Sequence, residues 1–220
     1  MHLFGLYLDV IRDRYPLYSS ATPITALRGA SPPALTMLPP SVRGLYSSKF
    51  GSEVVQIQNG FFFVNWRRVQ DAEYSRYDAL LNRFQQDWHD FQEMLATRAD
   101  LPRAAPSRCF MTYTNHAEQD AFSLQDMMQS WTSGSFPPQA VNISASYILN
   151  NNVEAGLTLL PALRVSDNRR VHQLTVEVSK PREADAGLVP LFNELHDAAR
   201  TLFQASTSEA AQQRWGKEDS

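Results

Sequence analysis

The chain of 220 residues has a single cysteine, Cys109, so no disulfide can form within it. Its nine glycines are scattered, and none lies in a Walker or dinucleotide-binding fingerprint. No run approaches the roughly 18 apolar residues of a membrane span. Residues 1–9 lack the basic start and the cleavage site of a signal peptide. We therefore expect a cytoplasmic protein that binds no cofactor and contacts no membrane.

An excess of positive charge is also absent. The net charge is −3, which argues against a dedicated nucleic-acid binder, so no nucleic-acid partner is expected. The hydrophobic fraction of 43% and the charged fraction of 20% are those of an ordinary globular protein. The length fits one large domain or two small halves that share a core.

The residues that most enzymes need do not form a recognisable pattern. No two of the five histidines have the short spacing of a zinc site, so no metal is expected. Cys109 begins an apolar stretch, where a free cysteine is usually a small buried hydrophobe. No Gly-x-Ser-x-Gly elbow is present. An acid–base site remains open, and these side chains are its candidates: His116, Glu118, Asp120, His196 and Asp197. The sequence thus assigns no catalytic residue and leans against an enzyme.

The strongest local signal is a β-hairpin over Glu53–Trp66. Asn59-Gly60 lies between two apolar runs, and this pair accepts the positive φ angles of a type I′ turn. The turn sets the register and predicts that Ile57 faces Phe62 and that Glu53 lies near Trp66. One face of the hairpin is then almost wholly apolar.

A long helix is predicted from about Ser75 to Arg98. Its apolar positions are spaced alternately by three and four residues: Tyr74, Tyr77, Leu81, Phe84, Trp88, Phe91 and Leu95. We expect this stripe to cover the apolar face of the hairpin, with Phe84 and Trp88 buried. A coiled coil between two copies is the alternative.

The remaining elements give an α+β fold, with largely antiparallel sheet packed against two long helices in two loosely repeated halves. The predicted organisation is a first half over 1–100, a connector over 101–108, a second half over 109–205 and a polar, frayed tail over 206–220. The first half opens with a helix over 3–14 and an extended, proline-rich connection over 17–48. The second half contains strands over 109–115, 141–149, 156–165 and 171–178, and helices over 124–131 and 188–205.

The first half differs from the second in starting directly with a helix. Its sheet is therefore expected to have one uncovered edge, which invites strand addition. A partner strand, a second copy or residues 17–48 folding back would fill that edge. Alternatively, the true gene starts upstream and supplies the strand itself.

Polar side chains at the ends of strands are the candidate binding residues. The first group follows the hairpin: Asn65, Trp66, Arg67 and Arg68. The arginines would bind an anion or stack on Trp66. The alternative is an ion pair with Asp71 or Glu73.

The second group lies in the second half. Asn115 and His116 are expected at a strand-to-helix junction, where functional side chains are common. The alternative is that Asn115 caps a turn. His196, on the last helix, is either a binding residue or a core-edge histidine bonded to a backbone carbonyl.

Four short motifs resemble a sporadically distributed family of bacterial proteins of unknown function. They are Asn65-Trp66-Arg67, Tyr74-x-x-Tyr77, Thr112-Tyr113-x-Asn115, and Leu195-His196-Asp197 followed by Phe203 and Trp215. The family usually has proline where this chain has Ser75, and a strand ahead of the first helix. The resemblance implies no catalytic residues, and the patchy occurrence of the family suits a bacterial defence or mobile-element gene set.

Together these observations favour a non-enzymatic binding or regulatory protein that acts through protein–protein contact. Its partner would be another protein or a second copy of itself. The alternative is a small-molecule or nucleotide-binding domain, or an enzyme, with a pocket between sheet and helices.

Overall fold

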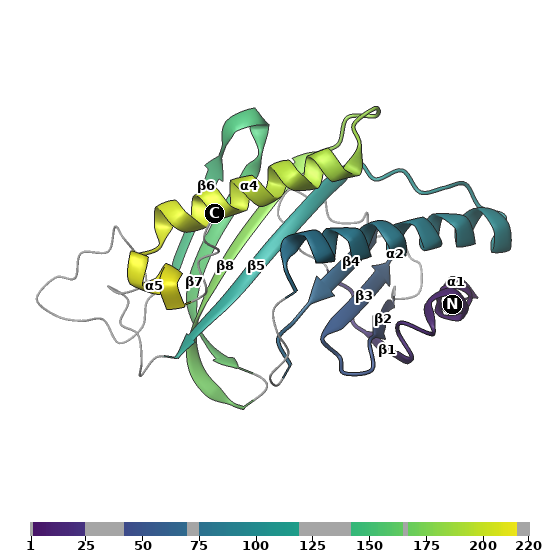
Figure 1. Ribbon diagram of the computed structural model, residues 1–220, viewed down its shortest axis with the longest axis horizontal. Helices are drawn as coiled ribbons and strands as arrows, with labels where there is room; N and C mark the ends of the chain where they lie inside the picture. Colours follow the sequence, from purple (N-terminus) through teal and green to yellow (C-terminus); the bar gives the residue numbers. More distant parts are fainter. Residues whose placement is uncertain (1, 25–41, 70–74, 119–141, 165–166, 215–220) are drawn as a thin grey trace, which may run out of the picture. The chain divides into compact units, whose positions relative to one another are not determined.

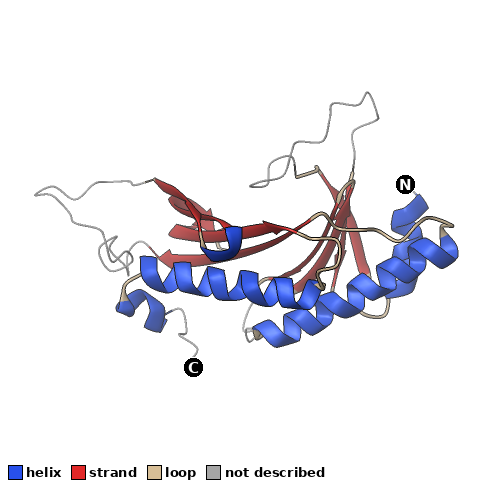
Figure 2. Ribbon diagram, turned by 90° about the horizontal axis from the view of Figure 1, so that it is seen from above, coloured by secondary structure: helices blue, strands red, loops and turns tan. Residues whose placement is uncertain are grey.

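The computed structural model describes residues 2–24, 42–69, 75–118, 142–164 and 167–214 (Figure 1). The chain divides into two compact units, Met1–Ala105 and Pro106–Ser220. Each unit has an antiparallel four-stranded sheet and its own hydrophobic cluster, so the fold is α+β with two cores instead of one shared core. The two long helices each lie along a face of the sheet in their own unit (Figure 2).

The first unit is a simple meander with two helices. Its elements are α1 (His2–Ile11), β1 (Leu17–Ala21), β2 (Arg43–Ser47), β3 (Glu53–Gln58), β4 (Phe61–Trp66) and α2 (Tyr77–Arg98). The strand order is β1-β2-β3-β4. The core lies where both helices meet the sheet and includes Tyr7, Ile11, Tyr46 and Val55, all fully buried.

The predicted hairpin is confirmed, with Glu53 opposite Trp66 and Ile57 opposite Phe62. The predicted turn type is wrong. Gly60 has a φ of 80°, whereas Asn59 is not among the residues with positive φ. Positive φ at the second central residue alone is the pattern of a type II turn, which needs glycine at that place.

Gly60 and Gly5 offer a matched pair of substitutions with opposite signs. Gly60→Val should destabilise the protein by about 1–2 kcal/mol, because a side chain is strained at positive φ. Gly5→Ala should stabilise it by about 0.5–1 kcal/mol, because alanine loses less entropy in a helix. A Cβ on Gly5 in α1 would meet nothing within 4 Å. Thermal unfolding of both variants tests this, and equal melting temperatures would contradict it.

The proline-rich connection was predicted to be extended, and its folding back onto the sheet was one of the alternatives. Its ends form β1 and β2, which pair from Leu17–Ser47 to Ala21–Arg43, while β2 continues onto β3. One flank of the hairpin is therefore filled by the two described ends of this connection, in agreement with one of the three outcomes considered. The outer edges of β1 and β4 pair with no strand of the described residues.

The long helix α2 begins at Tyr77, two residues later than predicted. Its aromatic side chains pack on the hairpin as expected, with the Phe62 ring 5.2 Å from that of Trp88 and 5.1 Å from that of Phe91. The expected burial of Phe84 and Trp88 is wrong, because both are half-buried. The buried face of α2 is rotated by part of a turn relative to the predicted apolar stripe, and it carries Asp87, Met94 and Leu95.

The second unit has the strand order β5-β8-β7-β6. Its elements are β5 (Arg108–Glu118), β6 (Ile143–Ile148), the short 3-10 helix η1 (Asn150–Asn152), β7 (Glu154–Arg164), β8 (Arg169–Pro181), α4 (Leu188–Ser206) and α5 (Glu209–Arg214). The four predicted strands and the final helix are confirmed. The repeat is loose, because the first strand of the second unit, β5, pairs with the last strand, β8, whereas the first strand of the first unit, β1, pairs with the next strand, β2.

Two expectations for the second unit are corrected. Asn115 and His116 do not lie at a strand end, because β5 continues to Glu118 and pairs them with Leu174 and Gln173 of β8. Asn115 therefore caps no turn. The tail does not fray at residue 206: α5 follows, and Ala211 is fully buried. The helix predicted over 124–131 lies outside the described residues.

Candidate functional site

The loop between β2 and β3 is held by its own backbone. The amide of Gly51 donates to the Ser48 carbonyl at 2.9 Å, and the amide of Ser48 donates to the Glu53 carbonyl at 2.9 Å. The Ser48 hydroxyl accepts from the Glu53 amide at 3.1 Å. Gly51 has a φ of 72°, which glycine adopts without strain. These bonds fix the direction in which the intervening side chains leave the loop.

Arg67 ties the end of β4 to this loop. Its amide donates to the Ser52 carbonyl at 2.8 Å, and its Nε donates to the Gly51 carbonyl at 2.7 Å. A Cβ on Gly51 would lie only 3.2 Å from the guanidinium, so the contact also favours glycine there. The predicted ion pair with Asp71 or Glu73 lies outside the described residues, since both acids are in 70–74.

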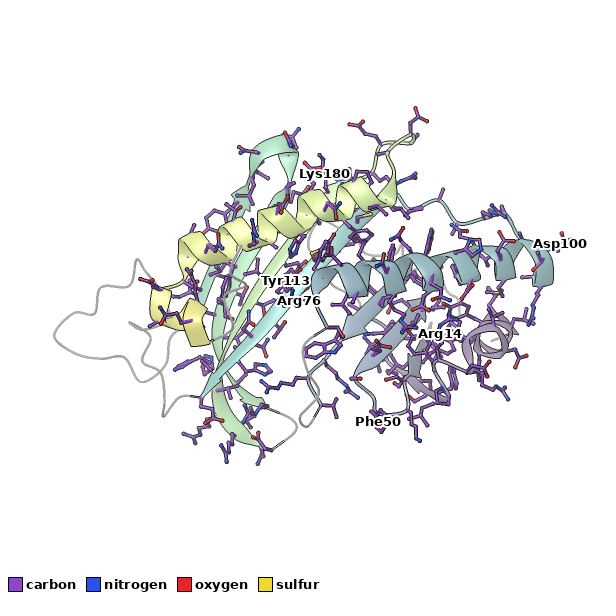
Figure 3. All side chains as sticks on the ribbon, viewed as in Figure 1. Arg14, Phe50, Arg76, Asp100, Tyr113 and Lys180 are labelled. Carbon is purple, nitrogen blue, oxygen red and sulfur yellow. The ribbon has the colours of Figure 1, made fainter. Side chains whose placement is uncertain are left out.

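The loop presents Phe50 to solvent. Its side chain is 77% exposed, more than any other exposed large hydrophobic residue of the described chain. Figure 3 shows it at the end of the β2–β3 loop. The Lys49 ammonium lies 5.7 Å from the centre of the ring. Exposure of an aromatic ring of this size to water is unfavourable in free energy, and contact with a partner would remove that penalty.

Exposed basic side chains adjoin this loop. Lys49, Arg67 and Arg68 are exposed, and none forms an ion pair with a residue that the structure describes. The nearest acid along β3, Glu53, lies 3.8 Å from Arg83 instead. We call Lys49, Phe50, Arg67 and Arg68 the Phe50 tip. It combines one exposed aromatic ring with three exposed basic side chains from the loop and from the residues that follow β4.

Two of the predicted binding residues lie beside this tip on β4. Asn65 donates through Nδ2 to the Val54 carbonyl at 3.5 Å, and Trp66 is half-buried opposite Glu53. Phe50 was missed because one aromatic residue in a polar loop carries no periodic signal. The dipeptide Lys49-Phe50 before Gly51 was the only clue in the sequence.

The other predicted residues belong to the second unit and are not brought together at one place. His116 Nε2 lies 3.3 Å from Gln173 Oε1 on β8. His196 Nδ1 lies 2.7 Å from the Tyr113 hydroxyl, so one of its partners is a side chain of β5. Asn115 faces the same side of the sheet as Tyr113, but the structure assigns it no ligand.

A second polar cluster, in the first unit, is centred on a buried carboxylate. Asp87 of α2 is fully buried and accepts from the Tyr15 hydroxyl at 2.6 Å and from Arg14 at 2.9 Å. Arg14 also donates to Asp90 at 2.5 Å, and the Tyr7 hydroxyl donates to the Asp87 carbonyl at 2.9 Å. Burial raises the pKa of Asp87, while the bonds from Tyr15 and Arg14 oppose the rise. The cluster joins α1 and the residues after it to α2, and Arg14 Nε is buried in it without a hydrogen-bond partner among the described residues.

Reactive and metal-binding groups are not assembled among the described residues. No group of three or more potential metal ligands occurs there. Burial raises the pKa of the Cys109 thiol to about 11, so it is protonated at neutral pH and a poor nucleophile. Among the described helices, none has the length and apolar character that crossing a bilayer requires.

No family model, curated protein or solved structure matches the chain. The likeness to a sporadic bacterial family therefore rests on the four short motifs alone. Of these, Tyr74 and Trp215 lie outside the described residues.

Proposed function

We propose that this protein is a non-enzymatic binding protein that acts through protein–protein contact at the Phe50 tip. The supporting observation is the 77% exposure of Phe50 beside Lys49, in a loop bonded by Arg67 and with Arg68 exposed next to it in the chain. Aromatic residues and arginine are the side chains most enriched where binding energy concentrates. The partner would offer an apolar pocket bordered by carboxylates. A cytoplasmic location and a role in a bacterial defence gene set belong to the same proposal as expectations.

Site-specific photo-crosslinking tests the proposal in cells that naturally make the protein. A photoreactive phenylalanine at position 50 should give a discrete adduct with one protein. The same group at Leu163, which is 58% exposed on β7, is the matched control and should give none. A missing adduct at position 50, or the same adduct at both positions, would overturn the proposal.

Charge reversal then tests the basic side chains of the Phe50 tip. Lys49→Glu with Arg68→Glu should abolish the adduct, because like charges would face the acidic border of the partner. Arg67 is left unchanged because it supports the loop. With the identified partner purified, Phe50→Ala should weaken binding by about 2 kcal/mol, or roughly 30-fold in Kd. An unchanged Kd would show that the tip is not the contact.

The tip should not bind nucleic acid tightly, although it combines an aromatic ring with basic side chains. The whole chain carries a net charge of −3, so the field around the tip is short-ranged. We expect no sub-micromolar binding to single-stranded DNA or RNA at about 150 mM salt. Fluorescence polarisation over a salt series tests this, and tight binding with a steep salt slope would refute it.

A further inference from the structure

The edge strand β1 is the most exposed strand of the first unit. Four of its five residues are exposed, whereas all six of β4 at the opposite edge are half-buried. Leu17 is 52% exposed and Tyr18 is 43% exposed. Open edges of this kind are usually protected by charge, proline or a bulge. Leu17–Ala21 contains no charged residue and no proline, and its ladder with β2 is continuous.

The backbone groups that face outward on β1 follow from the ladder. The amide of Ser48 donates to the Glu53 carbonyl, so every second pair from there, Tyr46–Val55 and Gly44–Ile57, is hydrogen-bonded between β2 and β3. The alternate residues of β2, among them Leu45, therefore bond to β1.

Leu45 is opposite Ser19, so Ser19 and its neighbours two residues away bond inward. Tyr18 and Ser20 then direct their N–H and C=O groups away from β2. No strand of the described residues pairs with them on that side. These two residues are the ones that an added strand would bond.

The residue sequence of β1 itself fits this short edge without a charge clash, and a second copy of the chain would supply it. In an antiparallel pair with Ser19 opposite Ser19 of a second copy, Tyr18 lies opposite Ser20 and Leu17 opposite Ala21. Both outward residues of each copy are then used, and each such pair exchanges both of its N–H···O bonds. Apart from the central Ser19 pair, each pair places a large side chain opposite a small one, which suits cross-strand packing.

We infer that β1 pairs with β1 of a second copy, which joins two four-stranded sheets into one continuous sheet. The pairing covers the apolar surface of Leu17 and extends the contact that the Tyr18 ring already makes with Tyr46, at 5.3 Å between centroids. The inference goes beyond the proposed function and does not depend on the Phe50 tip.

Sedimentation equilibrium over a concentration series tests the pairing. The wild-type chain of 24.9 kDa should approach twice that mass with a Kd of about 1–100 µM, because one short strand per copy makes a small interface. Ser20→Pro removes an outward donor in each copy and leaves the β1–β2 bonds intact, so it should weaken the dimer about 30-fold. Ser20→Ala is the matched control and should leave the Kd unchanged.

Charge substitution at Ser19 separates pairing from loss of the strand. Ser19→Lys places like charges opposite each other in the two-fold register and should weaken the dimer about fivefold. Ser19→Glu should do the same, and an equimolar mixture of the two variants should restore association as a heterodimer. A wild-type chain that stays monomeric at about 1 mM would overturn the inference. The inference would also be overturned if Ser20→Pro associated as strongly as the wild type. The same holds if the mixture of Ser19→Lys and Ser19→Glu associated no more strongly than either variant alone.

Discussion

Replacement of Asp87 by alanine should lower the free energy of unfolding by about 3–5 kcal/mol, the range for breaking a buried ion pair. Asp87 is fully buried, and its carboxylate accepts from Tyr15 and Arg14. Its removal leaves a buried hydroxyl without its acceptor and a guanidinium with Asp90 as its remaining acid. Denaturant unfolding monitored by tryptophan fluorescence measures the loss, because Trp88 is the next residue.

The surface ion pair between Arg12 and Asp9 supplies the control. Its side chains are 62% and 55% exposed, and the two atoms are 2.9 Å apart, the same distance as between Arg14 and Asp87. Exposed pairs contribute about 0–1 kcal/mol. Asp9→Ala should therefore shift the unfolding midpoint little. Similar losses for both variants would show that burial of the pair does not decide its effect.

Leu195→Ala should destabilise the protein by about 2–5 kcal/mol, because it leaves a cavity in a packed core. Leu195 of α4 is fully buried in the cluster that includes Leu174 and Val176 of β8. Differential scanning calorimetry should show a lower melting temperature for the transition of the second unit. The experiment also tests whether the helix covers the sheet as its apolar spacing predicts.

Leu163→Ala removes the same atoms from an exposed site. Leu163 is on β7 and 58% exposed, so the change should stay within about 0.5 kcal/mol of zero. If this variant lost as much stability as Leu195→Ala, the assignment of the second core would be wrong.

Sequence patterns recovered the elements that have a regular period or a defined turn. The hairpin register followed from Asn59-Gly60, and α4 followed from apolar residues on one helical face. The strands β1 and β2 were missed because their ends of the proline-rich segment, Leu17–Ala21 and Arg43–Ser47, alternate only weakly in polarity. Long-range pairing decides their structure, and a local pattern does not report it.

The polar features were harder to predict for a different reason. Asp87 lies within the apolar face of α2, and a sequence does not show that Arg14 and Tyr15, more than 70 residues away, will meet it. The same limit applies to Arg67, whose bond to Gly51 depends on the pairing of β3 with β4. Phe50 has no periodic pattern around it, and its exposure in the structure is what draws attention to it.

The bonds between Arg67 and the β2–β3 loop bear on the kinetics of binding. A flexible loop gives up conformational entropy when a partner orders it, at about 1–2 kcal/mol for each backbone residue fixed. Here the Gly51 and Ser52 carbonyls already accept hydrogen bonds from Arg67. The loop therefore loses this conformational entropy when the protein folds, and not when a partner binds. Under the proposed function, a preorganised aromatic ring with Lys49 beside it should associate rapidly with an acidic partner, at a rate that falls as salt is added.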